Sequence, residues 1–274
     1  MIPGITAGNP VAGGPELWTP AQITTQLWFD AADASTITIA TGVSQWNDKS
    51  GNARHVTQAT GANQPAYGAL QLNGIDVLTY DSTDALRKTS ATAGLVQNVG
   101  AVSIYSVRRF TDLASNASSP VVLAVSNNTA TTGRAAVYCS EADDNERMGG
   151  IRTDGQSFQA PATSVAINGA WSIHAALFNY ASAQASAFKD GSSVLAPTAF
   201  QDAGNTSNTA PATIGVGCWV DGSLSMKGNI AEVILTHTID TTERQLIEGY
   251  LAWKWGLEGS LPGGHPYKLA APTV

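Results

Sequence analysis

The chain has 274 residues, of which 43 % are hydrophobic and only 13 % are charged. This hydrophobic share is enough for a sizeable core, and the low charge predicts a surface made largely of Ser, Thr, Asn, Gln and Gly. The 14 basic residues against 21 acidic ones give a net charge of −7. That balance argues against nucleic acid as a partner, because nucleic-acid-binding proteins concentrate positive charge.

Residues 1–10 have neither the basic region nor the apolar core of a secretory signal. No apolar run approaches the length needed to span a membrane. We therefore expect a protein that is made in the cytoplasm and has no membrane partner.

Residues 1–22 are rich in Gly, Pro, Ala and Thr and lack periodicity, which predicts an extended N-terminal arm. Ile2, Ile5 and Val11 would give this arm apolar side chains to bury. Two interpretations stay open: a disordered tail, or an assembly arm that orders against a neighbouring subunit.

From residue 24 onward the pattern is typical of short strands separated by turns. Residues 171–180 carry apolar side chains on both alternating faces, which predicts a central strand covered on both sides. Asp190-Gly191 follows Ala187-Phe188-Lys189 and predicts a tight hairpin, because glycine readily adopts positive φ. The predicted strands are 26–31, 54–58, 75–80, 101–109, 120–126, 134–140, 171–180, 184–189, 212–219 and 228–237.

One helix is predicted over about 241–256. Asp240 can cap its first amides, with Glu243 completing a box-like pairing, and Gly256 can end it. Its broad apolar surface must pack on something, and we expect one end or edge of the sheets. The segment after the helix should then return over that surface.

The segments Leu27–Asp33 and Gly228–Leu235 lie about 200 residues apart, and both contain predicted strands. We predict that these first and last strands of the domain lie side by side. The predicted fold is all-β. It is a two-sheet antiparallel sandwich formed by one domain, residues 23–274, with an N-terminal extended arm and one C-terminal helix.

Five motifs carry a family resemblance: Leu27–Asp33, Gln45–Asn52, Gly228–Leu235, Glu243–Leu257 and Leu261–Tyr267. With them the chain resembles the laminin-G-like, concanavalin-A-like jelly-roll domains of bacteriophage virion proteins and some bacterial surface proteins. The resemblance covers 24–80 and 213–268, and is only architectural between them. It implies the fold strongly and the function weakly, because this fold hosts adhesins, virion components and glycosidases.

The resemblance implies a non-enzymatic bacteriophage structural protein on the virion surface. Two roles are open within it: a capsid decoration or head-fibre component, and a tail receptor-binding component that contacts host surface glycan. The partners implied are other capsid or tail proteins and further copies of the chain, with a trimer as one arrangement. The implied location is the virion.

An enzyme is the alternative. Glu141, Asp143 and Glu146 match the Glu-x-Asp-x-x-Glu spacing of retaining jelly-roll glucanases, in which two glutamates act as nucleophile and acid/base. The intervening and following residues are polar or small, and no Trp flanks the segment. That composition favours a solvated turn over a catalytic strand.

Calcium is the one cofactor that the sequence suggests, because related sandwiches hold it at the loop rim. Asp30, Asp33 and Asp48 are the candidate ligands, and stabilisation of turns is the competing interpretation. Cys139 and Cys218 lack paired metal-ligand spacing and are expected to be free, partly buried thiols.

Carbohydrate binding would need an aromatic platform beside polar groups. Most of the seven tryptophans fall in strand or helix patterns that predict core positions. Trp219, with Asp221 two residues later, is the best candidate near a loop.

Overall fold

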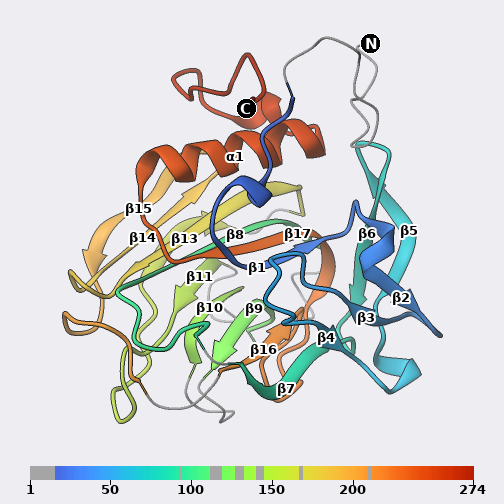
Figure 1. The fold of residues 1–274 in the computed structure, drawn as a ribbon, viewed down its shortest axis with the longest axis horizontal. Helices are drawn as coiled ribbons and strands as arrows, with labels where there is room; N and C mark the ends of the chain where they lie inside the picture. Colours follow the sequence, from blue (N-terminus) through green and yellow to red (C-terminus); the bar gives the residue numbers. More distant parts are fainter. Residues whose placement is uncertain are drawn as a thin grey trace.

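The computed structural model describes residues 16–92, 94–111, 119–126, 133–139, 145–166, 169–208 and 212–274. Within them the chain forms two antiparallel sheets, one of eight strands and one of nine, and a single α-helix outside the sheets (Figure 1). The predicted all-β sandwich with one C-terminal helix is confirmed.

The first sheet has the order β15-β14-β13-β8-β17-β6-β5, and β1 joins it by pairing with β17. Its strands are β1 (Thr25–Asp30), β5 (Ala66–Leu72), β6 (Ile75–Asp81), β8 (Ala101–Phe110), β13 (Ser172–Asn179), β14 (Gln184–Lys189), β15 (Ser192–Ala199) and β17 (Lys227–Thr236).

The second sheet has the order β12-β11-β10-β9-β16-β7-β4-β3-β2. Its strands are β2 (Ile37–Ile39), β3 (Val43–Trp46), β4 (Val56–Thr57), β7 (Leu86–Thr92), β9 (Val121–Ser126), β10 (Gly133–Cys139), β11 (Asn145–Gly149), β12 (Ala162–Ala166) and β16 (Ala212–Val216).

β17 brings the two ends of the domain together. β8 pairs with it on one side, and on the other side β6 pairs with its first half and β1 with its second half. A bulge between Ile230 and Glu232 lies where the partner changes. The predicted adjacency of the first and last strands is confirmed by the pairing of Asp30 with Glu232.

The main core fills the space between the sheets. Phe29 of β1 packs against Trp46 of β3 with ring centroids 5.3 Å apart, and both rings are fully buried. Side chains alternate along a strand, so Trp28 and Asp30 project from the opposite face of β1. The first sheet therefore carries a second layer of buried side chains beneath the helix.

The helix α1 (Thr241–Trp255) covers the outer face of the first sheet, where it contacts β8 and β13 (Figure 1). The prediction that it packs against an end or edge is wrong. It lies on a sheet face because its residues on that side, Arg244 and Lys254 among them, reach β14 and β17. The C-terminal segment returns over it as predicted, and Tyr267 packs against Gly249.

The ends of α1 follow the predicted signals only in part. Asp240 accepts a hydrogen bond from the Glu243 amide at 2.9 Å, and Gly256 ends the helix at φ 69°. The reciprocal half of the predicted box is absent among the described contacts, because the Asp240 amide donates to the Thr238 hydroxyl.

The segment predicted as a solvated turn around 141–150 contains strand β11, and this prediction is wrong for Asn145–Gly149. The strand forms because Glu146, Met148 and Gly149 are buried within the second sheet. Residues 140–144 lie outside the described residues.

Part of the predicted arm packs against the domain. Leu17 forms a bridge with Thr273, and the Trp18 ring lies edge-on to Tyr250 at 6.0 Å. Ile2, Ile5 and Val11 lie outside the described residues, so their part in assembly stays a prediction. In the described part of the chain, no helix combines the length and apolarity that membrane crossing requires.

Candidate functional site

A second apolar cluster lies on the outer face of the nine-stranded sheet. Along β10, Ala135 and Val137 face the main core, whereas Ala136 and Tyr138 belong to this separate cluster. The alternation follows from the pleat, which directs successive side chains to opposite faces. The cluster consists of Val121, Ala124, Ala136 and Val220, with Tyr138, Trp219 and Leu224 packed against them.

The loop after β16 places Trp219 on this face. Gly217 has φ +72°, and its amide donates to the Val122 carbonyl at 2.9 Å, so the chain turns back over β9. The Trp219 amide donates to the Ser223 carbonyl at 2.7 Å. The Asp221 carboxylate accepts bonds from the Ser223 amide and hydroxyl at 2.8 and 2.5 Å. Asp221 therefore shapes the turn that presents Trp219.

Phe158 adds a third ring to the cluster. Its segment is fixed by the bridge between Gly150 and Gln159, and its ring lies over Gly149, where a Cβ would approach to 2.6 Å. The Phe158 ring centroid is 6.4 Å from that of Tyr138 and 6.2 Å from that of Trp219. The side chain is nevertheless 40 % exposed.

These rings border a groove of about 250 Å³. An open groove with aromatic walls can hold the apolar face of a sugar ring, while hydroxyl and backbone groups bind its oxygens. Arg147 pairs with Tyr138 in the sheet register and so lies on the same face. The lining residues are Ser119, Val121, Tyr138, Phe158, Trp219 and Leu224.

Sequence reasoning singled out Trp219 and Asp221 but missed Tyr138 and Phe158. Tyr138 falls in a strand pattern that also fits a core residue. Phe158 carried a usable signal, because it is a lone aromatic residue in the polar run Gly155–Gln159. An isolated large apolar side chain in such a run is expected to be exposed.

The acidic cluster considered for glycosidase chemistry is not assembled among the described residues. Glu146 lies in β11 and is buried, with both carboxylate oxygens 2.9 Å from the Arg108 guanidinium. His174 Nδ1 is 2.5 Å from the same carboxylate, and its Nε2 is 2.7 Å from the Ser172 hydroxyl. Glu141 and Asp143 lie outside the described residues.

This network explains the charge state of its members. Burial acts to raise the pKa of Glu146, but Arg108 and His174 outweigh it and hold that pKa well below its usual range. Burial lowers the pKa of His174 to about 4. Glu146 is thus a carboxylate that links the two sheets, and it faces the interior rather than the groove.

The three carboxylates proposed for calcium are engaged by other groups. Asp48 accepts the amides of Trp28, Ser50 and Arg54 at 2.9, 2.9 and 3.0 Å, which makes it a turn residue. Asp33 accepts the Ser35 amide at 3.2 Å, where it caps a short 3-10 turn.

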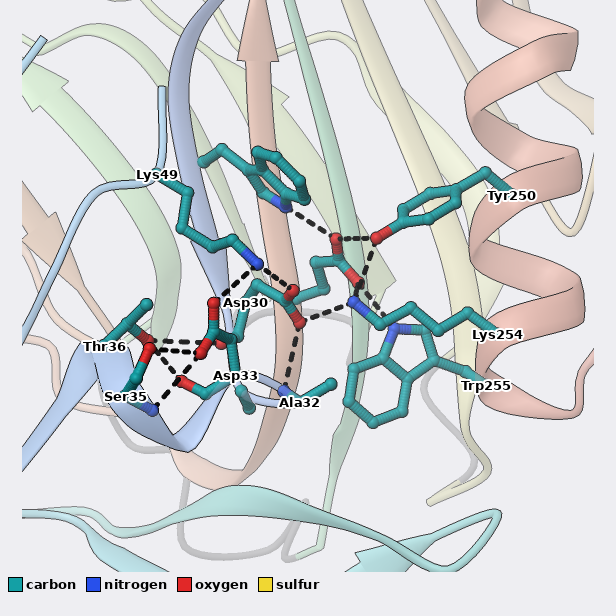
Figure 2. Close-up of polar contacts among 12 residues, drawn as sticks. Asp30, Ala32, Asp33, Ser35, Thr36, Lys49, Tyr250, Lys254 and Trp255 are labelled. Carbon is teal, nitrogen blue, oxygen red and sulfur yellow. Dashed lines mark hydrogen bonds and ion pairs between the residues drawn. The ribbon is translucent and has the colours of Figure 1, made fainter. Parts of the chain in front are cut away.

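Asp30 and Asp33 share Lys49, whose Nζ lies 2.8 and 2.9 Å from their oxygens (Figure 2). Lys254 binds the other oxygen of Asp30 at 2.5 Å. Burial acts to raise the pKa of Asp30, but the two lysines outweigh it and lower that pKa. No metal-binding group of three acidic, His or Cys side chains occurs in the described ranges, so the geometry does not favour the predicted calcium site.

No protein-family model and no curated protein sequence matches this chain. Solved structures match it in fold. The CBM40 module of a Ruminococcus gnavus sialidase gives a TM-score of 0.50 at 14 % identity, over 64 % of this chain and 95 % of the module. A botulinum neurotoxin type C structure gives 0.55 at 12 % identity, over 83 % of this chain and 51 % of that one. These proteins share one architecture with this chain. The fold is a jelly-roll sandwich.

The jelly roll also occurs in enzymes. A Trypanosoma rangeli sialidase gives a TM-score of 0.56 at 10 % identity, over 88 % of this chain but only 36 % of the sialidase. This neighbour contradicts the prediction that the protein is not an enzyme. A jelly roll does not exclude glycosidase chemistry, because function belongs to the site and not to the fold.

Proposed function

We propose that the protein binds carbohydrate in the groove bordered by Tyr138, Phe158 and Trp219. The observation that carries the proposal is the convergence of three rings on one outer sheet face, with Phe158 40 % exposed. Exposing such a cluster costs hydrophobic free energy, and surface patches of this kind mark binding sites.

Two proteins with this fold support the choice of ligand. The Ruminococcus gnavus module was solved bound to α2,6-sialyllactose, and cell entry of the botulinum neurotoxin depends on ganglioside molecules. Sialyllactose is a glycan, and a ganglioside is a glycolipid that carries a glycan headgroup. Within our groove, the rings would stack on a sugar face.

The test is a glycan array followed by titration calorimetry with the best glycan. Trp219→Ala and Phe158→Ala should each weaken binding at least about tenfold, because aromatic residues at the centre of a site carry most of the affinity. Trp171→Ala is the matched control, since this half-buried ring lies against Arg109 and does not border the groove.

If the parent binds glycan and both groove variants bind it with unchanged affinity, the glycan binds at another site on the protein. Absence of binding across the array would end the proposal. Incubating the parent with the bound glycan and analysing the products tests hydrolysis in the same samples.

We also propose that the protein acts on the surface of a bacteriophage virion, as an oligomer attached to capsid or tail proteins. The support is the sequence resemblance over 24–80 and 213–268 and a surface poor in charge. Gold-labelled antibody and electron microscopy of the source particle test this setting. Label on the head or the tail tip supports it, and unlabelled particles contradict it.

A further inference from the structure

Three reactive side chains meet beneath α1, in the layer between the helix and the first sheet. Asp30 ends β1 and Lys254 projects from α1 (Figure 2). Glu232 lies in β17. Asp30 and Glu232 are directly opposite in register, so their side chains leave the same face of the sheet. Lys254 Nζ lies 2.5 Å from Asp30 Oδ1 and 2.7 Å from Glu232 Oε2.

The triad is almost fully buried. Asp30, Glu232 and Lys254 are 4 %, 0 % and 6 % exposed. The indole nitrogens of Trp28 and Trp255 donate to the two Glu232 oxygens at 2.7 and 2.8 Å. Burial opposes the charge on each of these groups. A lysine that passes one proton to a neighbouring carboxylate becomes a neutral amine, which is a nucleophile.

We propose that Lys254 and Asp30 are joined by an amide bond that the folded protein forms by itself, with Glu232 as the proton carrier. The Lys254 nitrogen attacks Asp30 Cγ, a carbon–nitrogen bond forms, and the bond from Cγ to Oδ1 breaks. Two of the three ammonium protons pass through Glu232 to Oδ1, which leaves as water. The third stays as the amide hydrogen, and Glu232 returns to its starting state.

Three features of the site suit this reaction. Lys49 Nζ lies 2.8 Å from Asp30 Oδ2, where negative charge develops when nitrogen attacks. A cavity of about 140 Å³ borders Asp30 and Lys254 and gives the released water a way out. Burial also raises the pKa of Glu232, which favours its role as a temporary proton acceptor. The cavity is lined by Leu17, Thr19, Trp28, Asp30, Lys49, Tyr250, Trp253, Lys254 and Ala271.

The decisive measurement is the intact mass of the full chain under denaturing conditions. With the amide present, the mass is lower than the sequence mass by one water molecule. A proteolytic digest then contains a branched peptide that joins the segment around Asp30 to the segment around Lys254. An intact mass equal to the sequence mass means that the pair is only an ion pair, and it overturns the proposal.

Glu232→Gln tests the proton carrier. This variant should keep the full mass, because the amide of glutamine cannot accept the ammonium proton. Glu248→Gln is the matched control, since Glu248 is an equally buried acid that binds Arg244 and His265 away from the triad. The control should lose one water as the parent does.

Loss of water in Glu232→Gln would show that the bond forms without Glu232 and would overturn its assigned role. If that variant does not fold, the parent mass still decides whether the amide exists. Lys254→Arg, which keeps the charge but is far less nucleophilic, then reports whether Lys254 is the amine.

Discussion

At the scale of single residues, the described chain contains a buried carboxylate, Glu146, whose charge is balanced by a buried arginine. Glu146 is held by Arg108 through two bonds of 2.9 Å, and His174 completes the network as a neutral ring. Removing one partner of such a group leaves an uncompensated buried charge, which is strongly destabilising. The network therefore sets how the fold responds to acid.

We predict that acid destabilises the protein through His174. Burial lowers its pKa from 6.5 to about 4 in the folded state, so between these values only the unfolded chain binds the proton. The free energy of unfolding is fully kept above about pH 6.5 and falls as the pH drops through this window. His174 alone should account for about 2 kcal/mol between pH 7 and pH 5.

Urea unfolding at the two pH values measures this difference. The lowered pKa of Glu146 adds a further loss below its ordinary value of 4.5. His174→Asn should reduce the change between pH 7 and pH 5, whatever its effect on stability at pH 7. An equally steep change in the variant would assign the acid sensitivity to another group.

At the scale of elements, the strands that sequence reasoning missed include both edges of each sheet. These edge strands are β15, β5, β12 and β2. β5 and β15 carry no buried residue, and β15 contains Pro197, which central strands exclude. An edge strand needs no apolar face of its own, so its sequence lacks the alternation on which prediction depends.

The elements predicted correctly have the opposite character. β8, β13 and β17 are buried almost throughout, and a run of apolar residues bounded by turns indicates such strands directly. The hairpin at Asp190-Gly191 is predicted because glycine readily adopts positive φ, and the φ angles of the two residues are 50° and 77°. These signals are local in the sequence, so they can be recognised without knowledge of the fold.

The candidate sites were predictable only in fragments. Trp219 and Asp221 share one turn, and their local sequence was enough to single them out. Phe158 approaches Trp219 only because β11 and β16 belong to one sheet, and Lys254 binds Asp30 from 224 residues away. The order of the strands in a sheet brings such side chains together, and their separation in sequence follows no fixed spacing. A single sequence therefore does not reveal the contact.

At the scale of the molecule, the described N- and C-terminal segments close on each other. Trp18 is 6 % exposed against Tyr250, and its amide donates to the Pro272 carbonyl at 2.9 Å. We predict that Trp18→Ala lowers the free energy of unfolding by about 3 kcal/mol, the usual cost of truncating a buried aromatic residue.

Deleting residues 1–22 should destabilise the protein at least as much, because it removes Trp18 and the buried Pro20 together. Chemical denaturation of the parent, Trp18→Ala and the deletion measures both effects. Equal stability in all three proteins would show that residues 16–22 contact the domain without adding to its free energy of unfolding.

The meeting of β1, β17 and α1 has a mechanical consequence. A force that pulls residues 16 and 274 apart first loads the bridge between Leu17 and Thr273. With the proposed amide in place, the force is then carried by the joint at Asp30 and Lys254, which are 224 residues apart in sequence. While that joint holds, the chain between its two residues bears no tension, so the groove of Tyr138, Phe158 and Trp219 keeps its shape under load.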